Sequence, residues 1–143
     1  MEKERERAEE LGYLSPIHDD KESTDADYDA AIEYCLNHLD EIAFVAATHN
    51  ESSTQTLVQK MHESGLRPDH PNIFFSQLYG MSDNLSYVLA KNKYHVSKYV
   101  PYGPVRDAVP YLIRRAQENT SVTGQVSREL ELIAKELRRR KIG

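Results

Sequence analysis

Polar residues of ligand-binding types stand at or near the ends of three short strand candidates in this sequence. Thr48, His49 and Asn50 follow the run 42–47, Gln77 comes just after 73–75, and Tyr99 stands near the end of 95–100. In parallel α/β folds, reactive groups gather where strands end. We therefore expect these side chains to line a site for an anionic small molecule beside a polar cofactor. Each also has an ordinary alternative: a capped loop histidine, a glutamine bonded to neighbouring backbone, and a tyrosine used for packing.

A pair of arginines, Arg114 and Arg115, stands in the predicted helix that follows the third run. Ile113 belongs to the apolar stripe of that helix, and adjacent helical residues diverge by ~100°. The two guanidinium groups therefore cannot both point straight to solvent. Such a pair can hold a carboxylate or phosphate with bidentate geometry. The alternative is a solvated pair on an exposed helix face.

Several other kinds of chemistry find no support in the residues. The sequence has no Gly-rich phosphate loop, no G-x-S-x-G, no H-E-x-x-H and no Cys/His cluster. We therefore predict neither a Ser/His/Asp site nor a metal site. The lone Cys35 lies in a predicted helix, where a free cysteine is usually a small buried residue, and we interpret it as structural.

The elements that must position these residues follow from hydrophobic periodicity and helix-stop signals. We expect helices at 1–11, from a cap at 23–25 to 39, at 50–64, at about 83–91, from 105 to at least 116, and at about 127–141. The apolar run 42–47 is interpreted as a strand buried on both faces, and 73–75 and 95–100 as two further strands. Pro110 should bend the helix that contains it.

Short apolar strands that alternate with helices indicate βαβ units and a parallel sheet, so the predicted fold class is α/β. Three strands are too few for a closed barrel, because a complete (β/α)8 barrel takes roughly 250 residues. The chain is therefore either a small open sheet or a fragment, and composition leaves both open.

The composition is that of an ordinary globular domain. The 143 residues are 39% hydrophobic and 29% charged, with a net charge of −5, which argues against a nucleic-acid partner. A mean hydropathy of −0.67 excludes a membrane-spanning helix. The basic end, 138–141, suits the dipole of a helix C-terminus; a membrane surface or an acidic partner is the alternative.

Several segments together resemble the proline dehydrogenase family. They are KYVPYGPV at 98–105, YLIRRAQEN at 111–119, ATHN at 47–50 and FSQLYGM at 75–81, with ERERA at 4–8, GY at 12–13 and SPI at 15–17 matching the eukaryotic branch. The resemblance covers essentially the whole chain, and its longest run, 111–119, is the most specific.

The resemblance implies a distorted (βα)8 barrel that holds FAD at the C-terminal face of its strands. Residues 1–143 would be the C-terminal part of that barrel domain, incomplete at its N-terminus, with about three βα units plus terminal helices. It also implies oxidation of L-proline to Δ1-pyrroline-5-carboxylate, with electrons passed to ubiquinone. The implied location is mitochondrial, on the matrix side of the inner membrane, with peripheral membrane association of the full-length enzyme.

The resemblance also assigns roles to the residues that match its motifs. Thr48 and His49 would contact FAD, with Asn50 beside them and Gln77 near the isoalloxazine. Arg114 and Arg115 would clamp the proline carboxylate, and Tyr99 and Tyr111 would wall the substrate ring. Arg114, Arg115 and Tyr99 are thus the expected catalytic residues. Tyr99 favours proline, because hydroxyproline dehydrogenases of this family tend to carry a smaller residue there.

The sequence departs from the family pattern at its start. It begins just after the family's Arg-Gly-Ala strand motif, and the earlier strands, which bring a lysine and an aspartate to the site, are absent. The expected partner is therefore the missing N-terminal part of the barrel, and we expect the segment alone to be inactive. Hydroxyproline dehydrogenase, a non-catalytic truncated interaction fragment, and an unrelated module in which the arginine pair grips phosphate are the alternatives.

Overall fold

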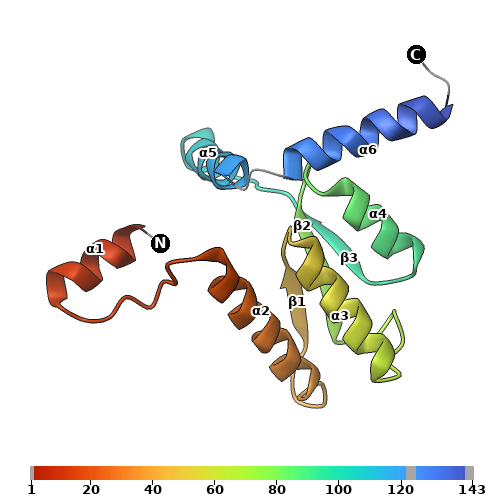
Figure 1. Ribbon diagram of the computed structural model, residues 1–143, viewed down its shortest axis with the longest axis horizontal. Coiled ribbons are helices and arrows are strands. Elements are labelled where there is room, and N and C mark those ends of the chain that lie inside the picture. Colours follow the sequence, from red (N-terminus) through yellow and green to blue (C-terminus); the bar gives the residue numbers. More distant parts are fainter. Residues whose placement is uncertain (1, 122–124, 141–143) are drawn as a thin grey trace. The chain divides into compact units, whose positions relative to one another are not determined.

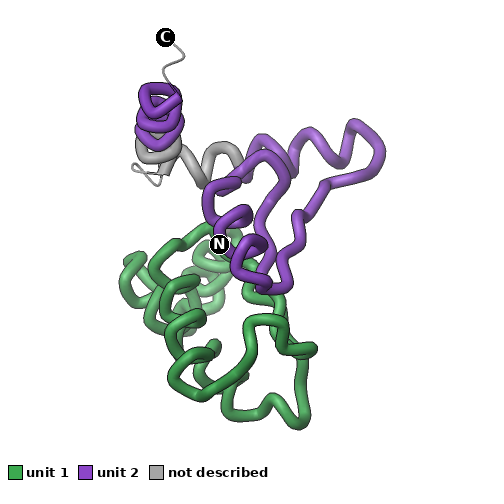
Figure 2. The backbone as a smooth tube through the Cα atoms, turned by 90° about the vertical axis from the view of Figure 1, so that its right-hand side faces the viewer, with its two compact units in different colours: residues 1–74 green, residues 75–143 purple. Residues whose placement is uncertain are grey.

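The computed structural model describes residues 2–121 and 125–140, and Figure 1 shows the helices and strands that they form. The chain divides into two compact units, residues 1–74 and 75–143 (Figure 2). In chain order the elements are α1 (Glu2–Leu11), α2 (Lys21–Leu36), β1 (Phe44–Ala47), α3 (Glu51–Glu63), β2 (Ile73–Leu78), α4 (Asp83–Lys91), β3 (Val96–Tyr99), α5 (Val105–Ser121) and α6 (Gln125–Arg140).

The strands form one sheet in the order β1-β2-β3. The β2–β3 pair is parallel, and its register pairs Gln77 with Lys98 and Leu78 with Tyr99. Parallel strands joined through a helix form the βαβ arrangement, so the predicted α/β class is confirmed. The closed barrel stays a prediction.

The core of the first unit lies mainly between α2 and α3, which pack together. Leu57 and Met61 stand one turn apart on α3, and both are fully buried. Removing a leucine side chain from water stabilises the fold by about 2 kcal/mol. The Lys60–Glu33 ion pair (3.0 Å) also joins the two helices, but pairs this exposed contribute little.

Helix α2 begins earlier and ends earlier than the sequence predicted. The residue at its N-cap is Asp20, whose carboxylate accepts a hydrogen bond from the Ser23 backbone N–H (2.6 Å). The predicted cap at 23–25 was therefore wrong, because Asp20 satisfies the free N–H groups of the first turn first. The helix ends at Leu36 instead of 39, with Asn37 as its C-cap.

Strand β1 is shorter than predicted and is not buried on both faces. It spans Phe44–Ala47, and of its four residues only Ala46 is buried; Val45 is 55% exposed. Alternate strand residues point to opposite faces, so only the face of Ala46 is well covered within the described chain. The continuous apolar run had suggested cover on both faces.

The core of the second unit is built by β2, α4 and β3. Phe75 is buried, and its ring meets that of Tyr94 edge-on at 5.5 Å between centroids. Leu89 of α4 is buried as well, and α4 packs against β3. Helix α4 has the predicted bounds.

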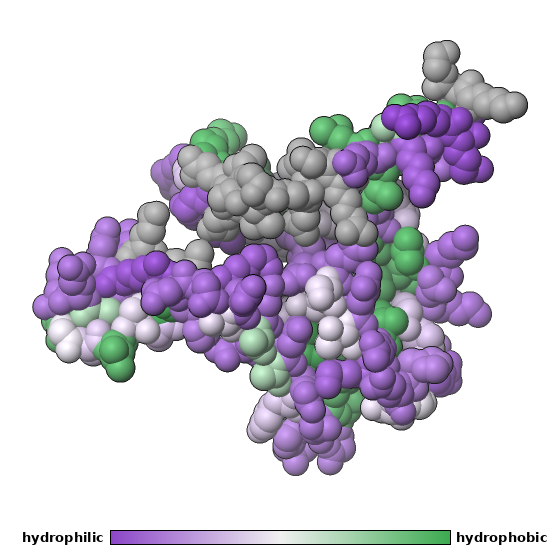
Figure 3. Space-filling view, viewed as in Figure 1, coloured by the Kyte–Doolittle hydropathy of each residue, from purple (hydrophilic) through white to green (hydrophobic). Residues whose placement is uncertain are grey.

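Helices α5 and α6 expose much of their predicted apolar faces. Val105 is 76% exposed and Ile113 51% on α5, and Leu130 is 61% exposed on α6; Figure 3 shows apolar side chains at the surface. Helix α5 runs past Pro110 as one element. Residue 141, the predicted end of α6, lies outside the described residues.

Candidate functional site

The polar residues after β1 form a hydrogen-bonded turn that leads into α3. Asn50 is the N-cap of α3, and its side-chain oxygen accepts hydrogen bonds from Ser52 N (2.9 Å) and Ser53 N (3.4 Å). The hydroxyl of Thr48 accepts a bond from Asn50 N (3.0 Å). Thr48, His49 and Asn50 are all half-buried, so their backbone is fixed while part of each residue stays accessible.

Gln77 lies in the core of the second unit and is only 2% exposed. Its side-chain oxygen accepts a hydrogen bond of 2.8 Å from the hydroxyl of Ser86 on α4. The sequence left open a structural bond or a ligand contact for this residue, and the structure gives it a side-chain partner on α4.

Gln77 and Tyr99 point to opposite faces of the sheet. Gln77 is in register with Lys98, and Leu78 is in register with Tyr99. Registered partners in a parallel pair share a face, and neighbours along a strand alternate. The face of Gln77 and Lys98 also carries buried Phe75, whereas Tyr99 is 53% exposed.

Three of the predicted substrate residues come together within the second unit. The rings of Tyr99 and Tyr111 meet edge-on with centroids 6.1 Å apart. The guanidinium carbon of Arg115 lies 5.6 Å from the centre of the Tyr111 ring, because residues four apart on a helix are neighbours. Arg115 is half-buried, and Arg114 is exposed. The cluster thus combines two aromatic walls with a cation, which suits a small ring that carries a carboxylate.

The sequence analysis missed the role of Lys98. Its ammonium lies 2.8 Å from the Asp83 carboxylate and donates a 2.6 Å hydrogen bond to the carbonyl of Met81. Met81 belongs to the segment that joins β2 to α4, and Asp83 is the first residue of α4. A lysine inside a predicted strand was the signal that could have drawn attention to it, since a lysine is rarely buried in a protein without a partner for its charge.

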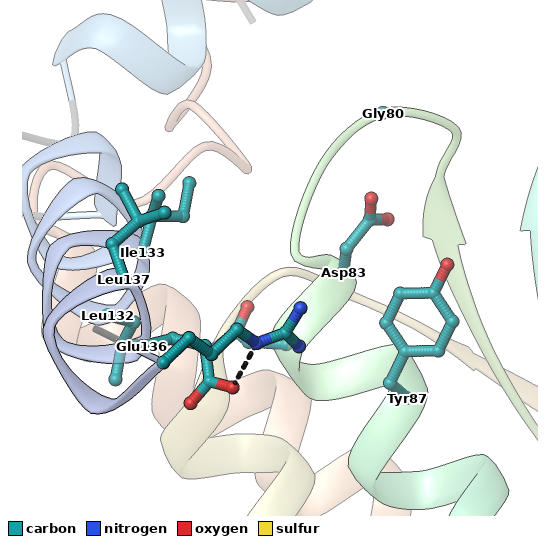
Figure 4. Close-up of a pocket in the computed structure, with 9 residues that line it drawn as sticks. Gly80, Asp83, Tyr87, Leu132, Ile133, Glu136 and Leu137 are labelled. Atoms are coloured by element: carbon teal, nitrogen blue, oxygen red, sulfur yellow. Dashed lines mark hydrogen bonds and ion pairs between the residues drawn. The ribbon is translucent and has the colours of Figure 1, made fainter. Parts of the chain in front are cut away.

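A groove of about 600 Å³ lies between α4 and α6 in the second unit. Figure 4 shows Asp83 and Tyr87 of α4 on one side and Leu132, Ile133, Glu136 and Leu137 of α6 on the other.

The carboxylate of Glu136 accepts hydrogen bonds from the side chains of Arg139 and Arg140. These bonds, Arg139's first, hold the pKa of Glu136 down at about 2. The carboxylate therefore stays ionised and neutralises part of the basic end of α6.

Residues 2–121 and 125–140 hold no cluster of three or more His, Cys, Asp or Glu side chains arranged to bind a metal ion. Among the helices of those same ranges, none combines the length and the apolar character that crossing a membrane requires.

Comparison with known proteins links these residues to one family. The family model described as proline dehydrogenase matches residues 1–128, a range that includes every predicted site residue. No solved structure matches the chain significantly.

The similar curated proteins carry two related names. Human "Proline dehydrogenase 1, mitochondrial" is 43% identical over 96% of this chain and 23% of its own length. Arabidopsis thaliana "Proline dehydrogenase 2, mitochondrial" is 41% identical over 98% of this chain and 30% of its own. Bos taurus "Hydroxyproline dehydrogenase" is 41% identical over the whole chain and 32% of its own. The chain thus spans between a fifth and a third of the length of these relatives.

Proposed function

Because this chain belongs to the proline dehydrogenase family, we propose that it is the C-terminal part of an FAD-dependent barrel that oxidises L-proline to Δ1-pyrroline-5-carboxylate. The strands β2 and β3 pair in parallel, and α4 connects them along the chain. This arrangement is compatible with one βα unit of such a barrel. On this proposal residues 1–143 are a single incomplete domain.

The cluster of Tyr99, Tyr111 and Arg115 is the observation that carries the proposal. We assign the substrate carboxylate to Arg115 and Arg114, since paired guanidinium groups bind a carboxylate with fixed geometry. The rings of Tyr99 and Tyr111, which are in edge-to-face contact, would pack against the five-membered ring of the substrate. Holding the carboxylate and ring together fixes the position of the ring carbon that is oxidised, and such positioning is a large part of catalysis.

The residues after β1 have the character that a polar cofactor site needs. Thr48, His49 and Asn50 are half-buried, and hydrogen bonds at 48 and 50 already order the turn. They stand at the start of α3, where the positive end of the helix dipole favours an anionic group such as a pyrophosphate. We assign these three residues to FAD.

When bound, FAD supplies the redox chemistry by accepting a hydride. We keep Gln77 in the cofactor set as well. Its bond to Ser86 would hold the end of β2 in one conformation.

We further propose that the full-length enzyme acts in mitochondria, on the matrix side of the inner membrane, and passes its electrons to ubiquinone. The word "mitochondrial" in the names of the human, Arabidopsis and Drosophila melanogaster relatives supports the compartment. The position on the matrix side of the inner membrane and the use of ubiquinone go beyond what those names say, and they are part of the proposal.

Turnover, in this proposal, needs the N-terminal part of the barrel, and the 143-residue chain alone lacks it. The exposed apolar stripe of α5, from Val105 to Ile113, supports this view. Apolar surface of that kind is normally covered by another part of a protein.

The proposal is tested by titrating the purified chain with FAD and following the quenching of flavin fluorescence. A five-membered-ring carboxylate such as tetrahydrofuran-2-carboxylate should perturb the bound flavin, and Arg115→Met should weaken that effect about tenfold or more. Arg106→Met, on an exposed residue of the same helix, is the matched control. No flavin binding by this chain, even with the N-terminal part of a relative added, would reject the assignment.

The second candidate is oxidation of hydroxyproline. It is favoured by the similar identity to "Hydroxyproline dehydrogenase" of Bos taurus (41%) and Xenopus laevis (38%). Tyr99 argues for proline, because its ring would occupy the space that a ring hydroxyl needs. Competition between L-proline and trans-4-hydroxy-L-proline for the carboxylate site decides between them, and Tyr99→Ser should improve the second ligand relative to the first.

A further inference from the structure

Lys98 joins two separate parts of the second unit through one ammonium group. Its side chain is only 23% exposed, and its Nζ lies 2.8 Å from Asp83 Oδ1. The same nitrogen donates a hydrogen bond of 2.6 Å to the carbonyl oxygen of Met81. An ammonium that loses most of its water is stable only when such partners replace the lost hydrogen bonds.

The segment that Lys98 holds has an unfavourable backbone. Between β2 and α4, Gly80 has φ +79° and Ser82 has φ +50°. Glycine adopts this left-handed region easily, but serine does not, and a non-glycine residue persists there only when its surroundings impose it. The side chain of Ser82 makes no capping hydrogen bond to α4. Two sets of bonds contribute to that constraint. The carbonyl of Ser82 accepts hydrogen bonds from the backbone N–H and the hydroxyl of Ser86, both 3.1 Å, and Lys98 holds Met81 and Asp83 on either side of Ser82.

The same segment is bonded to the main chain of Tyr99. The backbone N–H of Tyr79 donates a 2.9 Å hydrogen bond to the carbonyl of Tyr99. Lys98 and Tyr99 are consecutive, so their side chains point to opposite faces of the sheet. Lys98 therefore binds the segment 79–82 on one face of the sheet. On the other face, the ring of Tyr99 contacts the ring of Tyr111.

We propose that Lys98 is a positioning residue for the substrate site. By holding the segment 79–82 through Met81 and Asp83, it fixes the backbone of Tyr79 and Tyr99 and thus the place of the Tyr99 ring. The link to substrate rests on the proposed function above. The link to Tyr99 rests on the hydrogen bonds alone.

Three substitutions separate these contacts. Lys98→Met keeps the length of the aliphatic chain and removes both contacts, Asp83→Asn removes the charge pair and leaves the bond to the Met81 carbonyl, and Lys98→Arg keeps the positive charge. Lys91→Met is the matched control, because Lys91 is an exposed lysine at the end of α4 in the same unit.

Hydrogen exchange of backbone amides and the NMR signals of the Tyr99 ring are the first readouts, both on the 143-residue chain. We expect the Tyr79 amide to exchange about tenfold faster or more in Lys98→Met, with a smaller increase in Asp83→Asn. The Tyr99 ring signals should shift in Lys98→Met. Both effects should be much smaller in Lys98→Arg than in Lys98→Met. Lys91→Met should give the same exchange rates and ring signals as the native chain. The Phe75 amide, which donates to the His95 carbonyl at the other end of the β2–β3 pair, reports whether the second unit stays folded.

Affinity for tetrahydrofuran-2-carboxylate is the second readout. It should fall several-fold in Lys98→Met and recover in Lys98→Arg, which a general loss of stability would not produce. Unchanged Tyr79 exchange and unchanged Tyr99 signals in both Lys98→Met and Asp83→Asn would overturn the proposal. A native chain that binds no carboxylate would count against the proposed function instead, and the exchange and ring measurements would then decide the role of Lys98 by themselves.

Discussion

Arg115 holds its guanidinium group over the ring of Tyr111, one turn earlier on α5, at 5.6 Å from the ring centre. The contact restricts a side chain that would otherwise have many rotamers. An arginine ordered before a carboxylate arrives loses less entropy when it binds.

Replacing the Tyr111 ring should therefore weaken carboxylate binding. Tyr111→Leu removes the contact with Arg115 and the edge-to-face contact with Tyr99, and we expect a loss of about 1 kcal/mol in binding free energy, or about fivefold in affinity. Tyr111→Phe keeps both rings and should bind almost as the native chain does. Isothermal titration with tetrahydrofuran-2-carboxylate measures both variants. Equal loss in both would show that the hydroxyl group, and not the ring, matters.

The bond between Gln77 and Ser86 should couple the end of β2 to α4. Ser86→Ala removes the donor to a buried amide oxygen, and we expect it to lower the free energy of unfolding by about 1–2 kcal/mol. A double-mutant cycle with Gln77→Leu, read by urea unfolding, should give a coupling energy of about 1 kcal/mol. Purely additive effects would mean that the two side chains act independently.

Local signals in the sequence predicted the elements well. Helix α4 begins and ends where expected, and Asn50 caps α3 as predicted. Gly65, the expected stop of α3, has φ +66°. Each of these features depends on residues within a few positions of one another, so the sequence alone contains the necessary information.

Features that depend on distant partners could not be predicted in this way. The half-exposure of Val45 depends on which elements cover β1, and an apolar run does not show that. The face of Gln77 follows from its register with Lys98, which links strands separated by a whole helix. The grouping of Tyr99 with Tyr111 came only from the family resemblance, since no local pattern relates a strand end to a later helix.

Stability of the first unit should depend on pH through Asp20. Hydrogen bonds from Ser23 hold the pKa of this carboxyl below its ordinary value of 3.8. A lowered pKa in the folded state means that the stabilisation is present above pH 3.8 and is lost as the pH falls through the folded value. Asp20→Asn keeps a capping oxygen without the titration. Thermal unfolding from pH 2 to pH 7 should therefore show a shallower loss at low pH in Asp20→Asn, and identical slopes would contradict this.

The cap of α3 offers a way to separate the structural role of Asn50 from its proposed contact with the cofactor. Asn50→Ala leaves the N–H groups of Ser52 and Ser53 without their side-chain acceptor, and it should lower the free energy of unfolding by about 1 kcal/mol. Asn50→Asp keeps an acceptor, and its charge suits the helix N-terminus, so the stability should be retained.

FAD carries an anionic pyrophosphate, and an added carboxylate nearby should repel it. If Asn50 contacts the cofactor, Asn50→Asp should lose FAD affinity in the fluorescence titration while its urea midpoint matches that of the native chain. Asn84→Asp, at an exposed asparagine in the first turn of α4, is the control for a general charge effect. If Asn50→Asp keeps both its stability and its flavin affinity, then Asn50 serves only as a helix cap and does not belong to the cofactor site.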